Sequence, residues 1–445
     1  MRKLPVGLSS VLALNIGYLG MQFAWALEVA NMSGIYSFFH AKENNLGLLW
    51  LALPITGLIV QLIFGYFSDK TKSSYGKRAP YIFWGGLLTA LCMIILPNSL
   101  SLVMATLMLW AFTATINATV PSFRSLISDS LPETMHTMGY SVQAFFIGAG
   151  SVLASLMPWL LLFIINHSQS NTSNNIPVEL KFSFYIGAVI LIVTNLITIS
   201  ASRRLVRKDF LETITEALPI KRTFIEKFKR SMHVVWNMPK VMRQVSIVQF
   251  FTWMGVFCFI VYLTPMITEN IFGVSIGTDM MKSTSFHGIL EQSVILTGKY
   301  CAAYTLASVV FAFMIPKLSE RLSRKFVLMA ALFLAGLSLL SMKAMHEPHE
   351  IYFAMIGVGI AWASFNSIPF AMIARAIPKD QMGLFMGLFN VAVCLPQILV
   401  GISVSLLLKT VLHESAANVM LLAGLFFIIA AVMTGFVDDR EIKVS

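Results

Sequence analysis

The stretch QFAWALEVANM, residues 22–32, places reactive and hydrogen-bonding groups inside an apolar run. Gln22 can donate and accept hydrogen bonds, Trp25 presents an aromatic face, and the Glu28 carboxyl can take up or release a proton. If the run spans a membrane, a charged Glu costs at least ~2.5 kcal/mol on insertion scales, so its presence indicates a function. These residue types predict a binding site for a polar, hydroxyl-bearing solute beside a proton-exchanging group.

Helical periodicity gathers these groups on one face. At 100° per residue, a stripe about 140° wide on the first predicted helix holds Asn15, Tyr18, Gln22, Trp25 and Glu28. A narrower face on another predicted helix holds Thr113, Asn117, Pro121 and Arg124. A third face holds Gly383, Asn390, Gln397 and Gly401. In a membrane such faces turn away from lipid, towards other helices or a wet cavity. The alternative for Asn390 and Gln397 is that they only join helices.

Three tryptophans, Trp25, Trp253 and Trp362, lie inside predicted helices rather than in the usual interfacial belt. A sugar ring presents apolar C–H groups that stack on an indole, while its hydroxyls require donors and acceptors. Trp25 has Gln22 and Asn31 nearby in sequence and meets both needs. The alternative is that these tryptophans only pack against other helices.

Composition identifies the elements that must position these groups. The chain has 445 residues, of which 57% are hydrophobic and only 12% charged, too few charges to cover the surface of a soluble protein of this length. The four cysteines lie singly in apolar runs, without metal-ligand spacing. We therefore predict an all-α integral membrane protein.

Apolar segments long enough to span a bilayer occur in two sets of six. The first set covers 9–37, 46–67, 80–97, 101–128, 138–165 and 182–202. The second set covers 244–270, 289–315, 326–345, 351–376, 382–408 and 417–437. The prediction is an N-terminal six-helix bundle over 1–202, a basic cytoplasmic linker over 203–243 that includes an amphipathic surface helix, and a C-terminal six-helix bundle over 244–445.

The distribution of charge predicts the orientation. With the chain starting inside, most of the 32 Lys and Arg residues fall in cytoplasmic segments, as the positive-inside rule requires. Both termini are therefore expected in the cytoplasm, in a multi-pass protein of the cell or inner membrane. This anchoring accounts for the net charge of +11, and no nucleic-acid partner is expected.

The loop GYFSDKTKSSYGKRAP, residues 65–80, holds Gly65, Asp69, Lys77 and Arg78. Gly65 allows close helix approach, Asp69 can accept hydrogen bonds at a helix end, and Lys77 and Arg78 can pair with nearby acids. Asp129, near the end of the fourth predicted helix, is assigned to the same gate. The G-x-x-x-D and basic pattern between helices two and three resembles the signature of the major facilitator superfamily. The resemblance implies a gating role for these five residues and a fold of two six-helix bundles.

Further segments resemble one branch of that superfamily, the sucrose-carrier-like glycoside–pentoside–hexuronide:cation symporters. They are QFAWAL, NATVPSFRSLISD, SIPFA and GLFMGLFNVAVCLPQ, and they lie in both halves of the chain. The resemblance implies proton-coupled symport of a disaccharide or glucoside of the sucrose or maltose type. The candidate substrate-binding residues are Gln22, Trp25, Asn117, Arg124, Trp253, Asn366, Asn390 and Gln397.

One departure from this branch concerns the proton site. Plant sucrose carriers have an intramembrane Asp on helix four, eleven residues before the Arg, where this chain has Thr113. Helix two, residues 46–67, lacks the carboxylate that a sodium site of melibiose-type relatives would need. Glu28 is left as the proton-coupling residue, and the proton takes the place of any cofactor.

Other functions stay open at this point. A facilitator or exporter of another polar solute would share the fold, because fold alone does not set the substrate. A transporter-like nutrient sensor usually carries a longer cytoplasmic tail or loop. An enzyme would need a converging nucleophile, metal set or acid–base pair, which the motifs do not offer, and no nucleotide-binding G-x-x-x-x-G-K-S loop occurs. We expect a transporter that binds sugar and the lipid bilayer, and that acts as a monomer.

Overall fold

The computed structural model describes residues 7–71, 73, 77–132, 135–165, 176–209, 238–274, 284–376 and 382–438. The regular elements of this part of the chain are helices, and twelve helical spans within it are long and apolar enough to cross a membrane. This number confirms the prediction of about twelve spanning helices.

The N-terminal half supplies six of these spans. Its elements are α1 (Leu8–Asn15), α2 (Gly17–Phe38), α3 (Glu43–Leu49), α4 (Ala52–Lys70), α5 (Ala79–Ile95), η1 (Leu96–Asn98), α6 (Leu102–Ser130), α7 (His136–Ile164) and α8 (Val178–Asp209). The first predicted helix is divided at Ile16, whose backbone stays in the right-handed helical region, so α1 and α2 form one continuous span.

The C-terminal half supplies the other six. Its elements are α10 (Lys240–Phe272), α11 (Thr284–Leu322), α12 (Arg324–Ser341), η4 (Met342–Ala344), α13 (Pro348–Ala376), α14 (Met382–Thr410) and α15 (Ala416–Thr434). Gly273 ends α10 in the left-handed region at φ 68°, and its amide donates to the Glu269 carbonyl at 3.0 Å. Such a termination favours glycine because it has no Cβ.

The linker predicted over 203–243 is only partly described. α8 continues to Asp209 and α10 begins at Lys240, so both helices enter that range. Residues 210–237, which contain most of the predicted amphipathic surface helix, lie outside the described residues. The domain boundaries therefore stay a prediction.

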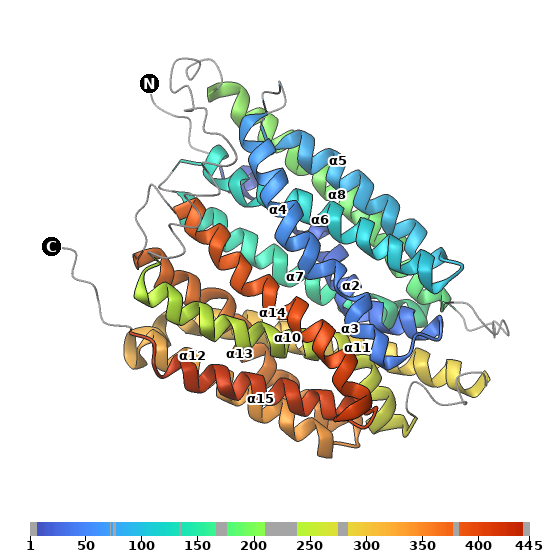
Figure 1. Ribbon diagram of the computed structural model, residues 1–445. Helices are drawn as coiled ribbons and strands as arrows, with labels where there is room; N and C mark the ends of the chain where they lie inside the picture. Colours follow the sequence, from blue (N-terminus) through green and yellow to red (C-terminus); the bar gives the residue numbers. More distant parts are fainter. Residues whose placement is uncertain are drawn as a thin grey trace.

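The two halves stand side by side and meet along a seam of helices (Figure 1). α2 packs on α10 and α11, α7 packs on α11, and α14 packs on α3 and α4. α2 therefore lies between its own bundle and the opposite one, and Trp25 of the stripe on the first helix reaches Trp362 of α13 across the seam.

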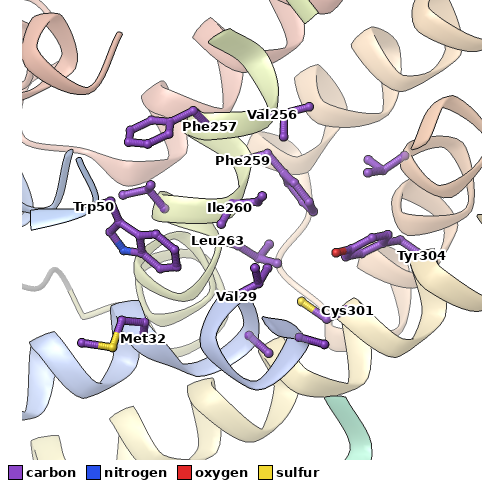
Figure 2. Packing of buried hydrophobic residues seen from close by; sticks show 14 of the residues in the cluster. Val29, Met32, Trp50, Val256, Phe257, Phe259, Ile260, Leu263, Cys301 and Tyr304 are labelled. Carbon is purple, nitrogen blue, oxygen red and sulfur yellow. The ribbon is translucent and has the colours of Figure 1, made fainter. Parts of the chain in front are cut away.

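Buried apolar side chains of α2, α10 and α11 pack together with Trp50 in the seam (Figure 2). Hydrogen bonds close the seam at the end where α2 leads into α3. The Ser33 hydroxyl donates to the Val261 carbonyl at 2.7 Å, and the Trp50 indole N–H donates to Ser33 Oγ at 3.0 Å. The Tyr262 hydroxyl donates to the Glu43 carbonyl at 3.2 Å. We call this end, defined by Ser33, Glu43, Trp50, Val261 and Tyr262, the sealed end.

Glycine allows two backbones to touch within the sealed end. A Cβ placed on Gly47 of α3 would collide with the Gly401 carbonyl oxygen of α14, and a Cβ on Gly401 would lie 3.0 Å from the Gly47 oxygen. Any side chain at either position would push the two halves apart.

Candidate functional site

Glu28 of α2 is buried, with 1% of its surface exposed. Neither carboxyl oxygen has a hydrogen-bond partner among the described residues. Met21, two turns earlier on α2, accepts a hydrogen bond from Thr119 of α6 at 3.6 Å, so Glu28 shares the face of α2 that meets α6. A buried carboxyl group without a partner is costly, which indicates that it acts through a proton or a bound ligand.

An aromatic cluster joins the two halves, and its member Trp25 lies one helical turn before Glu28 on α2. The ring of Trp25 on α2 lies 6.3 Å from that of Trp362 on α13, and Trp362 lies 6.4 Å from Trp253 on α10. Tyr304 of α11 and Phe365 of α13 each lie 5.4 Å from Trp362. The three tryptophans singled out in the sequence therefore meet around Trp362. We call these five residues the aromatic cluster.

Two polar atoms beside the aromatic cluster have no partner among the described residues: Trp253 Nε1 and Gln249 Oε1. The Gln249 amide donates to the Phe365 carbonyl at 2.8 Å, which fixes its side chain against the cluster. One unmet donor and one unmet acceptor beside aromatic rings suit a solute with hydroxyl groups. Sequence reasoning missed Gln249 and Tyr304; Gln249 lies one helical turn before Trp253, and that spacing was the available signal.

A second polar group surrounds Asn117 of α6. Its carbonyl oxygen accepts from the Gln61 amide of α4 at 2.6 Å, and its amide donates to Thr56 Oγ1 at 3.0 Å. The Asn390 amide of α14 donates to the Gly57 carbonyl of α4 at 3.4 Å, across the seam. A Cβ on Gly57 would lie 4.0 Å from Asn117, so the structure brings Asn117 and Asn390 to the same turn of α4.

The remaining predicted binding residues lie outside these two groups. The Gln397 amide is buried and donates to the Val393 carbonyl of its own helix at 2.9 Å, and the Asn366 amide donates to the Trp362 carbonyl at 2.9 Å. The side chains of Asn366 and Arg124 are exposed, and Gln22 is half-buried. Arg124 makes no hydrogen bond to Glu28, because neither Glu28 oxygen has a partner in the described part of the chain.

The predicted gating residues make their described contacts within the N-terminal half. Arg78 Nε donates to Asp129 Oδ2 at 2.7 Å, and Arg78 Nη1 donates to Ser68 Oγ at 2.8 Å. Ser68 lies 3.0 Å from the Ser122 hydroxyl. Arg78, at the start of α5, thus connects the ends of α4 and α6.

The structure shows less about the contacts of the other predicted gating residues in this loop. Lys77 is exposed, and the side chain of Asp69 lies outside the described residues. A Cβ on Gly65 would lie 3.6 Å from Pro121, an ordinary contact distance, so the approach of α4 to α6 there does not require glycine. The close helix approach expected at Gly65 is therefore not observed. Its gating role stays a prediction.

Comparison with known proteins identifies the family. The sequence model described as "Major Facilitator Superfamily" matches residues 14–401 of the chain. The chain belongs to the Major Facilitator Superfamily. It is a membrane transporter by family and not an enzyme, as the sequence predicted.

Within this superfamily, the chain is similar to proteins that are named as sucrose and alpha-glucoside transporters. The sucrose transport protein SUC4 of Arabidopsis thaliana is 25% identical, with 86% of this chain and 81% of the relative covered. The sucrose transport protein SUT5 of Oryza sativa subsp. japonica is 24% identical over 86% of this chain and 79% of its own length. The general alpha-glucoside permease of Schizosaccharomyces pombe is 24% identical over 58% of this chain and 48% of its own length.

Solved structures confirm the fold. The nucleoside transporter NupG superposes with a TM-score of 0.67 at 15% identity, covering 95% of this chain and 98% of its own. The POT family transporter PepTSo superposes with a TM-score of 0.68 at 11% identity, covering 98% of each chain. The shared fold is the two-bundle architecture predicted from the signature loop.

Proposed function

We propose that the protein is a secondary active transporter that carries a disaccharide or related glucoside together with a proton. The observation that carries the proposal is the contact of Trp25 with Trp362 across the seam, one helical turn from the unpartnered Glu28 carboxyl. Support comes from the relatives, whose names refer to sucrose and alpha-glucoside transport. Fold neighbours at 11–15% identity carry no information on the substrate.

In the proposed binding mode the sugar enters between the halves and stacks on the indole of Trp25. The unpartnered Trp253 N–H donates to one hydroxyl, and Gln249 Oε1 accepts from another. Because Trp25 belongs to the N-terminal half while Trp253 and Trp362 belong to the C-terminal half, a sugar held by all three stabilises a state with the halves together. This coupling of binding to closure is what alternating access requires.

Glu28 couples a proton to this cycle in our proposal. A protonated carboxyl donates a hydrogen bond to the sugar or to its surroundings, and an ionised carboxylate cannot. Binding of the proton therefore strengthens binding of the sugar, and by linkage the sugar strengthens binding of the proton. Release of both on the other side lets Glu28 return empty.

Helix packing offers a reason why the acid is on α2 in this chain. α2 and α6 run in opposite directions and touch at Met21 and Thr119. Glu28 lies about 10 Å further along α2, and Thr113 lies about 9 Å back along α6, so the two residues are at nearly equal depth. Thr113 occupies the position where the resemblance implies an Asp. We propose that Glu28 supplies from the neighbouring helix the carboxyl that Thr113 does not.

The state of the transporter follows from the orientation proposed from charge. With both termini in the cytoplasm, the sealed end faces outward and the end that holds Arg124 and Asn366 faces the cytoplasm. Both of these side chains are exposed, whereas the side chains of the sealed end are buried. We propose that the structure represents the outward-closed state.

Transport into proteoliposomes tests the proposal. Purified protein is reconstituted, and uptake of labelled sucrose, maltose and trehalose is measured with and without an imposed pH gradient. At least one of these sugars should accumulate above its external concentration only when the exterior is acidic. Equal uptake at both pH conditions would indicate a facilitator, and no uptake of any of the three would contradict the sugar assignment.

A further inference from the structure

A groove at the seam, between α7 and α11, holds a lysine that belongs to a membrane-spanning helix. Lys299 of α11 places its ammonium group 4.9 Å from the ring centre of Trp159 on α7. The groove has a volume of about 320 Å³ and is lined by residues of both halves, among them Val152, Leu156, Trp159, Lys299, Leu306 and Tyr352. This volume lies in the lower part of the range of small-molecule sites, roughly 300–1,000 Å³.

The polar part of the groove lies close to one membrane surface. Trp159 is about 8 Å from the end of α7 at Ile164, and Tyr352 is about 6 Å from the start of α13 at Pro348. The Tyr300 hydroxyl, on the residue after Lys299, donates to the Pro348 carbonyl at 2.8 Å and fixes α11 at the same level. Trp and Tyr at this depth are typical of the headgroup region of a bilayer.

The apolar part extends towards the middle of the membrane. Leu156 lies one turn and Val152 two turns below Trp159 on α7, and Leu306 lies two turns below Lys299 on α11. The groove therefore has a cationic and aromatic opening at headgroup level and an apolar floor beneath it. That order matches a phospholipid molecule, with its charged phosphate above its acyl chain.

The charge of the residues that line the groove determines which lipid headgroups it favours. Lys299 contributes a positive charge, and none of the described residues that line the groove is acidic. A lysine ammonium binds a phosphate group as a point charge. We propose that this groove is a binding site for an anionic phospholipid, with Lys299 bound to the headgroup phosphate and one acyl chain lying along Val152, Leu156 and Leu306.

The site has a consequence for the transport cycle. Trp159 belongs to the N-terminal half, and Lys299 and Tyr352 belong to the C-terminal half. A lipid that contacts all three bridges the seam and favours the arrangement in which α7 and α11 are together at this end. The inference concerns the bilayer and does not depend on which solute the transporter carries.

Native mass spectrometry of the purified full-length protein tests the proposal. The detergent-solubilised protein is titrated with dioleoyl phosphatidylglycerol or with dioleoyl phosphatidylcholine. The wild type should bind its first phosphatidylglycerol about tenfold more tightly than phosphatidylcholine. Lys299→Gln should lose this preference, and Lys299→Arg should keep it because the charge remains. Equal phosphatidylglycerol affinity in the wild type and Lys299→Gln would overturn the proposal.

Two further variants separate lipid binding from a structural role of the lysine. Lys343→Gln removes an exposed lysine near the same end, whose ammonium donates to Asn418 Oδ1, and should bind both lipids like the wild type. Leu156→Trp fills the apolar floor without changing charge and should weaken phosphatidylglycerol binding at least fivefold. Should Lys299→Gln fail to fold, unchanged affinity in Leu156→Trp would still contradict the site.

Discussion

The sealed end and the aromatic cluster lie on the same seam but differ in whether their buried polar groups have hydrogen-bond partners. At the sealed end Ser33, Trp50 and Tyr262 each donate to an acceptor, and every one of these bonds fixes one element against another. Trp253 Nε1 of the aromatic cluster and the Glu28 carboxyl, one helical turn from Trp25, have no partner within the described chain. Both regions are buried or nearly so, so access to water does not explain the difference.

The comparison separates residues that stabilise the structure by internal hydrogen bonds from residues whose polar groups are available to a ligand. A buried polar group left without a partner costs about 1–3 kcal/mol, and a charged group costs more. The hydroxyl and indole donors of the sealed end avoid this cost by internal hydrogen bonds. Trp253 Nε1 and Gln249 Oε1 at the aromatic cluster, and the Glu28 carboxyl on α2, retain it, which is expected where a bound solute or proton supplies the missing partner. The predictions below test this distinction, beginning with the largest effect.

Replacing the unpartnered acid should abolish coupling. Glu28→Gln cannot exchange a proton, so it should exchange labelled sugar across proteoliposomes but fail to accumulate it against a gradient. Accumulation driven by acidic exterior pH should fall at least tenfold. Uphill uptake at the wild-type level would remove Glu28 from the coupling role.

Glu269 provides the matched control for Glu28. Its carboxylate accepts from the Ser415 hydroxyl at 2.5 Å and from the Ala417 amide at 3.1 Å, so its partners are already present. Glu269→Gln should keep pH-driven uptake within about twofold of the wild type. A loss of coupling as large as that of Glu28→Gln would remove the distinction between partnered and unpartnered acids.

Removing the indole at the centre of the seam should weaken binding. Trp25→Ala should reduce sugar affinity by about 1–3 kcal/mol, judged from the apolar area that the ring buries, and Trp25→Phe should retain much of it. Isothermal titration calorimetry measures both. Trp50→Phe, which removes the bonded indole of the sealed end, should instead lower thermal stability and leave sugar affinity nearly unchanged. Equal affinity in the wild type and Trp25→Ala would place the sugar elsewhere.

Adding one methyl group to the sealed end should disturb closure. In Gly47→Ala the new Cβ collides with the Gly401 carbonyl, and overpacking of this kind costs about 1–3 kcal/mol. Turnover should fall severalfold and the melting temperature should drop by several degrees. Gly288→Ala is the control, because a Cβ there meets nothing within 4 Å. Similar behaviour of the two variants would contradict a tight contact between α3 and α14.

The smallest effect is expected at the charged pair of the loop. Asp129 is 39% exposed on its side chain, and pairs near the surface contribute about 1 kcal/mol or less. Asp129→Asn should therefore slow turnover about two- to fivefold while sugar affinity stays within twofold. A collapse of affinity in a folded Asp129→Asn protein would show that the loop does more than gate.

Local sequence properties determined the architecture and part of the site. Length and apolarity of each segment decide whether it can span a bilayer, and both are readable without neighbours, so twelve spans could be predicted. Helical periodicity placed Trp25 and Glu28 on one stripe of the first span for the same reason. The signature loop and the four further segments predicted the family.

Only the tertiary structure decided which side chains meet. Periodicity gives the direction of a side chain around its own helix, but it does not say which helix of the other half lies opposite. The contact of Trp25 with Trp362, the pairing of Arg78 with Asp129, and the position of Gln249 against the aromatic cluster each depend on such a neighbour. Whether a buried polar atom has a partner is likewise a property of the packed molecule, and this property separates Glu28 from Glu269.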